Sequence, residues 1–403
     1  MNELSSLGLI LLFALAAGHL ARHLRIPEVT GYILAGVAVG PAGLGWVSQD
    51  NLAALQVFSE VALGLILFSI GSIFHYERVV SIGRAVLRVT LTESVLAGGL
   101  VAAAMLVSGQ GWRVSLLLGA IAIETAAAST LMVVRECNAK GPLTDTLLGI
   151  IGINNILALT AFALAGAAIE VAAGVGGGHL LATLYRSAFF FFWQLAGSVA
   201  LGFLVGILLA AWVARVTEHG EVLMLLTGAV LLCVGLAMVL DLSTLVASMA
   251  VGATMVNLST HTPRAFETFS RSDPPFFAIL FVIAGADLHV GNLTSLGAVG
   301  LLYVVARAGG KFLGARAGAR KAGLSENVQR HLGFGIMSQA GLAIGLTLVV
   351  SRRFPDVAPA VSTVVLAAVV VFEMVGPISV RMALDRSGES QRMPAEPAGA
   401  VGD

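Results

Sequence analysis

The sequence predicts an all-α polytopic membrane protein with about thirteen transmembrane helices, in which a set of six helices is repeated in inverted orientation. The prediction rests on composition, on the spacing of apolar runs and on the charges between them. Of the 403 residues, 57% are hydrophobic and 11% are charged, and the mean hydropathy is +0.93. Soluble domains carry about 25% charged residues. A soluble fold of this composition would lack a polar surface, so we exclude it.

The apolar runs set the number and the ends of the helices. A membrane-spanning helix needs about 20 consecutive apolar residues. Thirteen runs fit, at 5–21, 28–45, 53–74, 86–108, 114–134, 144–170, 187–213, 221–240, 243–258, 274–289, 293–314, 331–351 and 357–384. They form one transmembrane domain over 1–384. Residues 385–403 are polar and contain proline and glycine, which predicts a disordered cytoplasmic tail.

The basic residues predict the orientation. If the N-terminus lies outside and the helices alternate, seventeen of the 23 basic residues fall on the inner side, which carries the positive excess in membrane proteins. Four lie outside, and Arg307 and Lys311 lie within a span. If one helix were miscounted, every later loop would be assigned to the opposite side of the membrane, and the basic residues would no longer gather on one side. The asymmetry therefore supports an odd number of spans. We expect a multi-pass protein of the inner (plasma) membrane with a cytoplasmic C-terminus.

Polar residues in the middle of spans recur at a nearly constant offset of 214 to 218 residues. The offset predicts two repeats, 5–172 and 221–384, joined by a linker helix at 187–213. The first repeat enters the membrane from outside and the second from inside, so the repeats are inverted. Inverted repeats are typical of secondary transporters. The matched pairs are Glu93 with Arg307, Glu124 with Gln339, and Asn155 with Glu373.

Two helices are predicted to be broken at mid-membrane. One carries Glu124-Thr125 followed by small residues, and the other carries Ser338-Gln339-Ala340-Gly341. Small residues permit unwound backbone and close helix approach, and unwound backbone at this depth must line a cavity or be buried in protein. We therefore place the transport site at these breaks. We expect Ser338 and Gln339 to satisfy backbone groups there rather than to select ions.

Five segments resemble one transporter family. They are IPEVTGYILAGVAVGPAGLG (26–45), EVALGLILFSIG (60–71), AKGPLT (139–144), RAGGK (307–311) and SQAGLAIG (338–345). Over residues 5–384 the chain resembles the monovalent cation:proton antiporter-2 family, which includes potassium-efflux and sodium/proton antiporters. The resemblance implies the sodium/proton antiporter fold, in which a dimerisation domain adjoins a core domain with two unwound crossing helices. It also implies a homodimer that exchanges Na⁺ or K⁺ for protons by movement of the core within the bilayer.

One position departs from the family pattern. Where the family usually has an acidic pair, or an amide followed by aspartate, this chain has Asn154-Asn155. The second residue of the pair is the carboxylate for which cation and proton compete in the family. The amide of Asn155 can bind a cation through its oxygen, but it cannot titrate. The usual competition therefore cannot take place on this residue.

Two other groups could titrate. Glu124 lies beside Thr125 at the expected crossing, and a buried carboxyl group can hold a proton near neutral pH. Lys311 lies one turn after Arg307 on the same helix face, and it could pair with Glu124 or Glu373 or release its own proton. Arg307 could instead cap unwound carbonyl groups. Glu93 and Glu373 are further mid-span acids that could lie near the transport path.

The leading interpretation is a monovalent cation:proton antiporter with Glu124 or Lys311 as the titrating group. The alternative is a pathway for an anion, another solute or an uncoupled ion on the same scaffold, because the fixed negative charge is lost beside two cations. A sensor or scaffold would be expected to carry an added soluble domain, and none is found in the sequence. The sequence offers no catalytic constellation, cofactor motif or metal cluster, so an enzyme is not expected. The net charge of zero gives no reason to expect a nucleic-acid partner.

Overall fold

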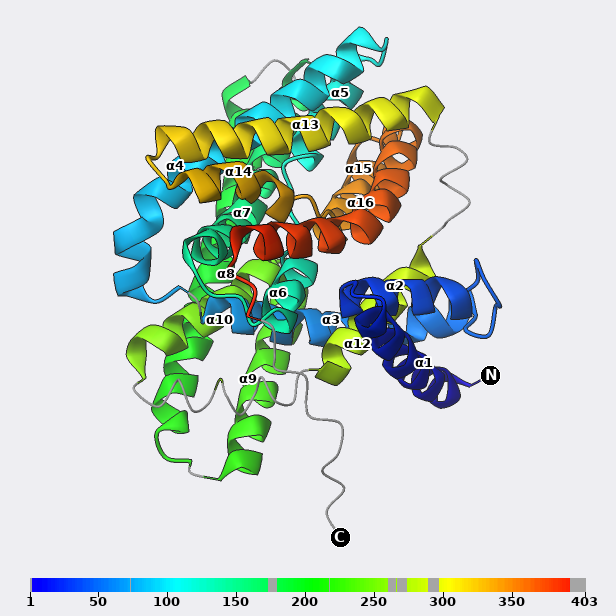
Figure 1. Ribbon diagram of the computed structural model, residues 1–403. Coiled ribbons are helices and arrows are strands. Elements are labelled where there is room, and N and C mark those ends of the chain that lie inside the picture. The colour runs from blue at the N-terminus through cyan, green and yellow to red at the C-terminus, as the bar shows by residue number, and fades with distance from the viewer. Residues whose placement is uncertain are drawn as a thin grey trace.

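The computed structural model describes residues 2–72, 74–172, 180–216, 218–259, 266, 274–288 and 297–391, with backbone only for 77–82 and 180–192. Within these ranges the regular structure is helical throughout (Figure 1). The helices are α1 (Glu3–His23), α2 (Glu28–Val39), α3 (Gln49–Gly71), α4 (Tyr76–Val107), α5 (Trp112–Ile121), α6 (Ala127–Glu136), α7 (Pro142–Ala172), α8 (Leu180–Val213), α9 (His219–Val239), α10 (Thr244–Leu258), α12 (Pro274–Asp287), α13 (Gly297–Lys321), α14 (Glu326–Gly335), α15 (Gly341–Arg353) and α16 (Ala358–Ser387).

The helices follow the predicted runs in order. Two predicted spans, 114–134 and 331–351, are each divided into two short helices, α5 with α6 and α14 with α15. Within the described part of the chain, eight helices are long and apolar enough to cross a membrane: α1, α3, α4 from Gly83, α7, α8 from Trp193, α9, α13 and α16. The all-helical membrane fold is therefore confirmed. The count of thirteen spans and the inverted repeat stay predictions.

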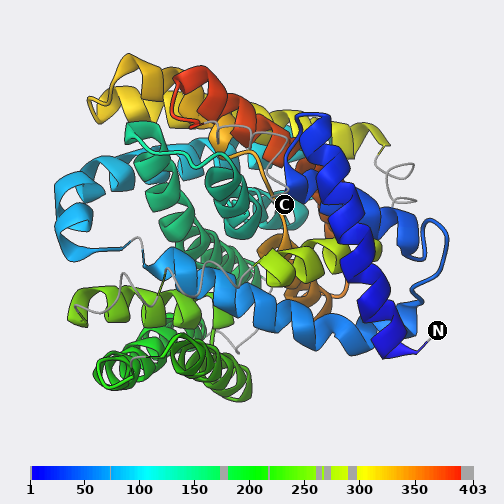
Figure 2. The ribbon, with the colours of Figure 1, turned by 60° about the horizontal axis from the view of Figure 1, so that its bottom comes forward.

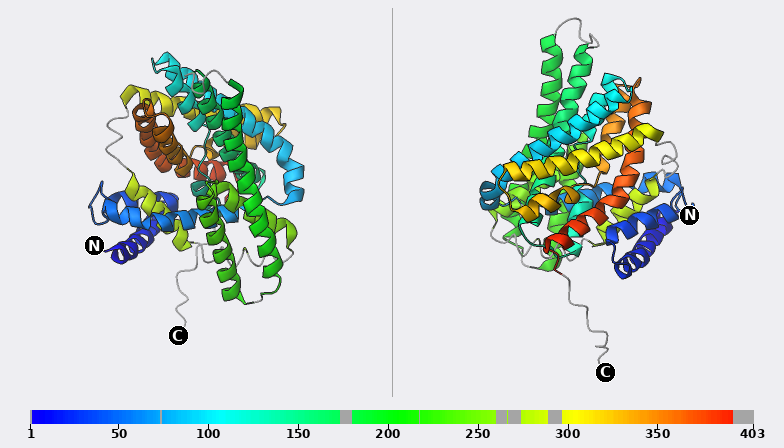
Figure 3. Two further views of the ribbon diagram at one scale, coloured as in Figure 1. Left: turned by 180° about the vertical axis from the view of Figure 1, so that it is seen from behind. Right: turned by 45° about the horizontal axis from the view of Figure 1, so that its top comes forward.

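The helices pack into two groups. The first, which we call the core bundle, contains α4, α5, α6, α7, α13, α14, α15 and α16. The second, which we call the flanking group, contains α1, α2, α3, α8, α9, α10 and α12. Figures 2 and 3 show the groups from three further sides, with α4 and α13 lying along each other in the core bundle. The groups meet where α2 and α3 contact α6 and where α7 contacts α8.

Glycine brings α4 and α13 close together. On α13, Gly310, Gly314 and Gly318 recur every four residues, so they share one helix face. A Cβ atom on Gly314 would lie 2.6 Å from the Cα atom of Glu93 on α4, closer than real contacts allow. The close packing of these backbones needs glycine at this position, and it fixes Glu93 opposite the middle of α13.

The end of the chain folds back onto the start of α7. The backbone N–H groups of Leu143 and Thr144 both donate to the Glu389 carboxylate at 2.7 Å, as does the Thr144 hydroxyl. The first N–H groups of a helix have no partner within the helix, and a carboxylate at that end is stabilised by the helix dipole. Gln391 N–H further donates to the Cys137 carbonyl.

This contact corrects the predicted start of the disordered tail. Helix α16 continues to Ser387, and the Glu389 side chain is buried. Residues 385–391 are therefore folded, whereas the prediction placed them in the tail. The sequence assigned them there because they are polar, and their partners lie about 245 residues away in the chain. Residues 392–403 lie outside the described residues.

Candidate functional site

The breaks in the two divided helices meet in the core bundle. Residues 122–126 separate α5 from α6, and residues 336–340 separate α14 from α15. The two segments touch directly, because Ala126 N–H donates to the Ser338 carbonyl at 3.1 Å. Each break leaves backbone carbonyl and N–H groups without helical partners at the centre of the bundle. That these helix ends belong to two unwound transmembrane helices stays a prediction.

Arg307 satisfies carbonyl groups of both breaks. Its guanidinium donates to four backbone oxygens, at 2.6 to 3.2 Å, and its side chain is fully buried. The guanidinium also lies over the Phe372 ring, 4.3 Å from the centroid. The capping role considered for Arg307 from the sequence is the one its contacts support. The accepting oxygens belong to Ala122, Glu124, Met337 and Ser338.

Lys311 forms a buried ion pair with Glu93. The Lys311 Nζ atom lies 2.5 Å from Glu93 Oε1, and both side chains are fully buried. The ammonium also donates to Thr125 Oγ1 at 2.8 Å and to the Ile123 carbonyl. The sequence suggested Glu124 or Glu373 as its ion-pair partner, which is wrong. The glycine face of α13 selects Glu93 instead, because it brings α4 next to Lys311.

Asn154 completes this group of buried polar side chains. Its amide donates to Glu93 Oε2 at 2.8 Å, and its carbonyl oxygen accepts from the Thr125 hydroxyl at 3.3 Å. We call Glu93, Thr125, Asn154 and Lys311 the closed cluster. Its members bind one another, and the Lys311 charge is balanced by the Glu93 charge.

Gln339 also satisfies groups at the breaks. Its amide nitrogen donates to the Ile121 carbonyl at 3.2 Å and to the Tyr303 hydroxyl at 3.1 Å. The Ser338 carbonyl accepts from Arg307 and from Ala126 N–H. The contact of Gln339 with the Ile121 carbonyl is the backbone-satisfying role that we expected for it, whereas Ser338 Oγ has no hydrogen-bond partner among the described residues, so that role is not found for Ser338.

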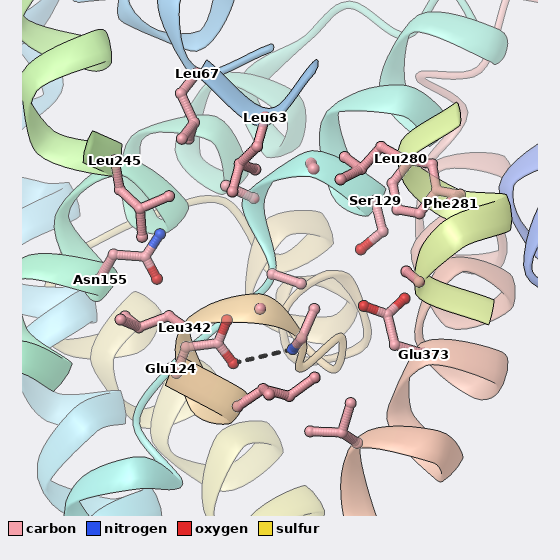
Figure 4. A pocket seen from close by; sticks show the side chains of 18 of the residues that line it. Leu63, Leu67, Glu124, Ser129, Asn155, Leu245, Leu280, Phe281, Leu342 and Glu373 are labelled. Atoms are coloured by element: carbon pink, nitrogen blue, oxygen red, sulfur yellow. Dashed lines mark hydrogen bonds between the residues drawn. The ribbon is translucent and has the colours of Figure 1, made fainter. Parts of the chain in front are cut away.

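A cavity of about 140 Å³ lies on the other side of the crossing (Figure 4). It is lined by apolar side chains together with Glu124, Ser129, Asn155 and Glu373, which we call the open cluster. All four side chains are at most 5% exposed. Glu124 Oε2 accepts from Ala340 N–H at 3.3 Å. Among the described residues, Ser129 Oγ, Asn155 Oδ1 and Glu373 Oε2 have no hydrogen-bond partner.

The open cluster contains oxygen atoms suited to a cation. Buried polar atoms usually have partners, so three unpartnered oxygens around one cavity indicate a place for a ligand. Carboxylate, amide and hydroxyl oxygens accept hydrogen bonds or bind cations. The sequence singled out Glu124 and Asn155, gave Glu373 only a weak assignment and missed Ser129. Ser129 lies five residues after Glu124, and only the break turns both side chains to one cavity.

Two larger cavities adjoin the open cluster. One, of about 420 Å³, is lined by Glu60, Gln194 and Arg353 and shares Leu63 and Leu342 with the central cavity. The other, of about 620 Å³, is almost entirely apolar. It shares Asn155 with the central cavity, and Leu245 lines all three cavities. Of the open cluster, Asn155 also lines the second of these cavities, and the closed cluster lines none of the three.

Comparisons with known proteins identify the family and the fold of the chain. The family described as "sodium/hydrogen exchanger, transmembrane" matches residues 8–386. The ammonium/H⁺ antiporter subunit AmhT of Alkalihalophilus pseudofirmus is 28% identical over 252 residues, which cover 62% of either chain. The iron transporter MagA of Paramagnetospirillum magneticum is 31% identical over 153 residues, 37% of this chain and 34% of MagA. The chain thus spans less than two thirds of the length of these curated relatives.

Solved structures show the same fold. Two structures of the sodium/proton antiporter MjNhaP1 of Methanocaldococcus jannaschii, one at pH 8 and one from electron microscopy, match with TM-scores of 0.69 and 0.68. Each match covers 96% of this chain, and 98% and 96% of the two MjNhaP1 chains, at 17% and 16% identity. The family match extends over nearly all the described helices and includes both clusters. The chain therefore belongs to the sodium/hydrogen exchanger transmembrane family.

Proposed function

We propose that the protein is a monovalent cation:proton antiporter that works by alternating access, with Glu124 as its titrating group. The observation that carries the proposal is the position of the Glu124 carboxyl group. It lines the central cavity, which shares lining residues with two further cavities, and it accepts a hydrogen bond from Ala340 N–H. It can therefore meet either a cation or a proton without breaking the packing of the core bundle.

Lys311 is the weaker of the two candidate titrating groups. Its ammonium is held by Glu93, Thr125 and the Ile123 carbonyl, and it does not line the cavity. Loss of its proton would leave the buried Glu93 carboxylate without its opposite charge, which is costly. We therefore assign Lys311 to stabilising the crossing.

The exchange follows from competition at Glu124. In the ionised form its carboxylate attracts a cation, and the unpartnered oxygens of Ser129 and Asn155 complete the coordination. In the protonated form the carboxyl group no longer attracts the cation. If only the cation-loaded and protonated forms change access from one side to the other, the movement of one species drives the other. Asn155 thus serves as a neutral ligand.

The same proposal includes the surroundings of the exchanger. We place it as a homodimer in the inner membrane, with the N-terminus outside, from the resemblance and from the loop charges. The core bundle would move against the flanking group. Candidate cations are Na⁺ and K⁺, and the relative AmhT adds ammonium to those worth testing.

The alternative of an anion or uncoupled pathway has less support. An anion pathway requires that Arg307 and Lys311 make the cavity positively charged. The charged groups that line the central cavity are Glu124, Glu373 and Asp287, all acidic. An acidic cavity favours cations over anions.

The test uses the full-length protein in liposomes with an internal pH indicator. An outward proton gradient is dissipated by adding Na⁺, K⁺, Li⁺ or ammonium, with choline and protein-free liposomes as controls. We expect cation-dependent proton movement in the wild type and a loss of at least about 100-fold in Glu124→Gln, the scale for a positioned proton-transfer group. Glu326→Gln is the matched control, since Glu326 is exposed and pairs with Arg330 one turn away. Equal exchange in Glu124→Gln and wild type would contradict the assignment.

A further inference from the structure

Glu373 is a second acidic group at the cavity. It lies on α16, is 4% exposed and has an Oε2 atom without a hydrogen-bond partner among the described residues. Figure 4 shows Ser129 and Glu373 directed toward one another, with Glu124 across the cavity. A Cβ atom on Gly376, one turn further along α16, would lie 2.3 Å from Ser338 Oγ. Glycine at this position lets α16 lie against the α14–α15 break, which brings Glu373 to the cavity.

A buried carboxyl group without full hydrogen bonding is costly, and hydrogen bonds elsewhere in the bundle do not compensate for it. The closed cluster shows how this chain satisfies such a group when its role is only structural. Glu93 has an ammonium and an amide as partners. In the part of the chain that the structure describes, Glu373 Oε2 has no partner, although Arg307 lies over the ring of the neighbouring Phe372. This contrast points to a ligand that supplies the missing contacts.

The charges at the crossing limit what that ligand can be. Five charged side chains are buried there: Glu93, Glu124, Arg307, Lys311 and Glu373. Lys311 neutralises Glu93, and the four carbonyl groups hold Arg307 without neutralising it. Ionised Glu124 and Glu373 would then give a net charge of minus one. Asp287 also lines the cavity, but it comes from α12 of the flanking group, is exposed, and accepts from Gln49 at 3.4 Å.

Either one proton or one monovalent cation brings this net charge to zero. A core that changes access within a membrane moves most easily without net charge, because charge in a low-dielectric medium is costly. Two carboxyl groups that share a site also resist ionising together, so they retain one proton between them in the absence of a cation. The site therefore has the same net charge, zero, when it holds one proton and when it holds one monovalent cation.

We propose that Glu373 is the second carboxylate of the cation site, and that Glu124 and Glu373 together exchange one shared proton for one monovalent cation. A cation enters the cavity, both carboxylates become ionised around it, and the proton leaves to water. On the other side a proton returns to the pair as the cation leaves. One positive charge crosses in each direction, so the exchange is electroneutral. This inference rests on the proposed antiport function and adds its second ligand and its stoichiometry.

The first test measures charge movement in the wild type. Full-length protein in liposomes is driven with Na⁺, or with whichever cation the proton assay identifies, and a membrane potential of either sign is imposed. We expect the same rate of cation-dependent proton movement at every potential and no steady transport current. A rate that follows the potential, or a steady current, would overturn the shared single proton.

The second test uses Glu373→Gln, with Glu373→Asp as its conservative partner and Asp385→Asn, on an exposed part of α16, as the control. We expect Glu373→Gln to raise the KM for the cation by about tenfold or more, the cost of losing one charged ligand. We also expect its pH profile to move to lower pH, because Glu124 no longer has a like charge that helps it retain a proton. Glu373→Asp keeps the charge and should retain the wild-type pH profile. A purely structural role would not shift the profile.

The outcomes separate this inference from the proposed function. Antiport in the wild type with unchanged KM and pH profile in Glu373→Gln would overturn the role of Glu373 and leave Glu124 as the only titrating group. Wild-type protein that moves no protons in response to any cation would overturn the antiport function itself. If Glu373→Gln fails to fold, the cation KM of Glu373→Asp decides: a carboxylate that is one methylene group shorter should bind the cation more weakly, and an unchanged KM would overturn the role of Glu373.

Discussion

Asn154 and Asn155 are adjacent in the chain, yet they belong to opposite kinds of polar cluster. Asn154 lies in the closed cluster, where amide, hydroxyl, ammonium and carboxylate groups bind one another. Asn155 lies in the open cluster, where three oxygen atoms have no partner among the described residues. The two clusters flank one helix crossing. The comparison suggests that one side of the crossing holds it together and the other side is left free for a ligand.

The difference comes from backbone packing. Glycines of α13 bring α4 close, so that the chain itself supplies every partner in the closed cluster. On the other side, the crossing faces a cavity bordered by α3 and α12 of the flanking group. A membrane interior offers no water to make up missing hydrogen bonds. Polar groups there must bind protein or face a cavity, and each cluster represents one of these solutions.

The largest expected effect comes from breaking the closed cluster. Glu93→Gln removes the opposite charge of Lys311, and loss of one partner of a buried ion pair costs about 3–5 kcal/mol. We expect a strong loss of folded protein, measured by thermal unfolding and by size-exclusion chromatography in detergent. The double variant Glu93→Leu with Lys311→Met should recover part of that stability, since it leaves no unpaired charge. Unchanged stability in Glu93→Gln would contradict the structural role of the pair.

A carboxyl group just beyond the end of a predicted span extends the comparison. Glu136 ends α6, two residues beyond the predicted span, and accepts from Glu28 N–H at 2.8 Å and from Arg381 at 3.1 Å. Burial nevertheless raises the pKa of Glu136 to about 7, and the nearby Glu28 carboxylate adds to the increase. The raised pKa means that the folded state binds the proton more tightly than the unfolded state.

The sign of the pH effect follows from that difference. The contribution of Glu136 is fully favourable below pH 4.5 and is lost as the pH rises through 7. Relative to Glu136→Gln, the wild type should therefore lose roughly 3 kcal/mol between pH 4.5 and pH 8. Chemical or thermal unfolding of both proteins at several pH values checks this result. If the free energies of unfolding of the two proteins changed with pH in the same way, burial would not be what raises the pKa of Glu136.

The smallest effects come from the two asparagines as a matched pair. Asn154→Ala leaves Glu93 and Thr125 with one fewer partner each and should cost about 1–3 kcal/mol of stability. Asn155→Ala removes an oxygen that has no partner, so its cost should be smaller by about 1 kcal/mol. Transport should respond in the reverse order, with the greater rise in cation KM in Asn155→Ala. Unfolding curves and proton-flux assays of both variants test the pair, and equal costs would argue against two distinct clusters.

Much of the helix order could be predicted from the sequence, because apolar length reports directly on a membrane span. Helices α5 and α14 end, and α6 and α15 begin, near Glu124-Thr125 and Ser338-Gln339, where the sequence places polar groups among small residues. The pairing of Lys311 with Glu93 could not be predicted. It depends on the register between α4 and α13, which the contacts of Gly310 and Gly314 set in three dimensions.

The burial of Glu389 was equally hidden, because a polar residue near the end of a chain gives no sign that it will fold back. The same holds for Ser129 at the cavity, whereas Glu373 was predicted only as a mid-span acid that could lie near the transport path. Nothing in their spacing shows that a break and a glycine contact bring both to one place. Local patterns identify the elements of this protein, and contacts between distant segments decide which polar residues meet.

The Glu389 contact connects the segment that follows α16 to the helix that carries both asparagines. The Glu389 carboxylate holds the first turn of that helix, α7. Asn155 lies thirteen residues into that helix, about 20 Å along a stiff rod at 1.5 Å per residue. One continuous helix thus connects the buried Glu389 carboxylate to the asparagine that lines the central cavity.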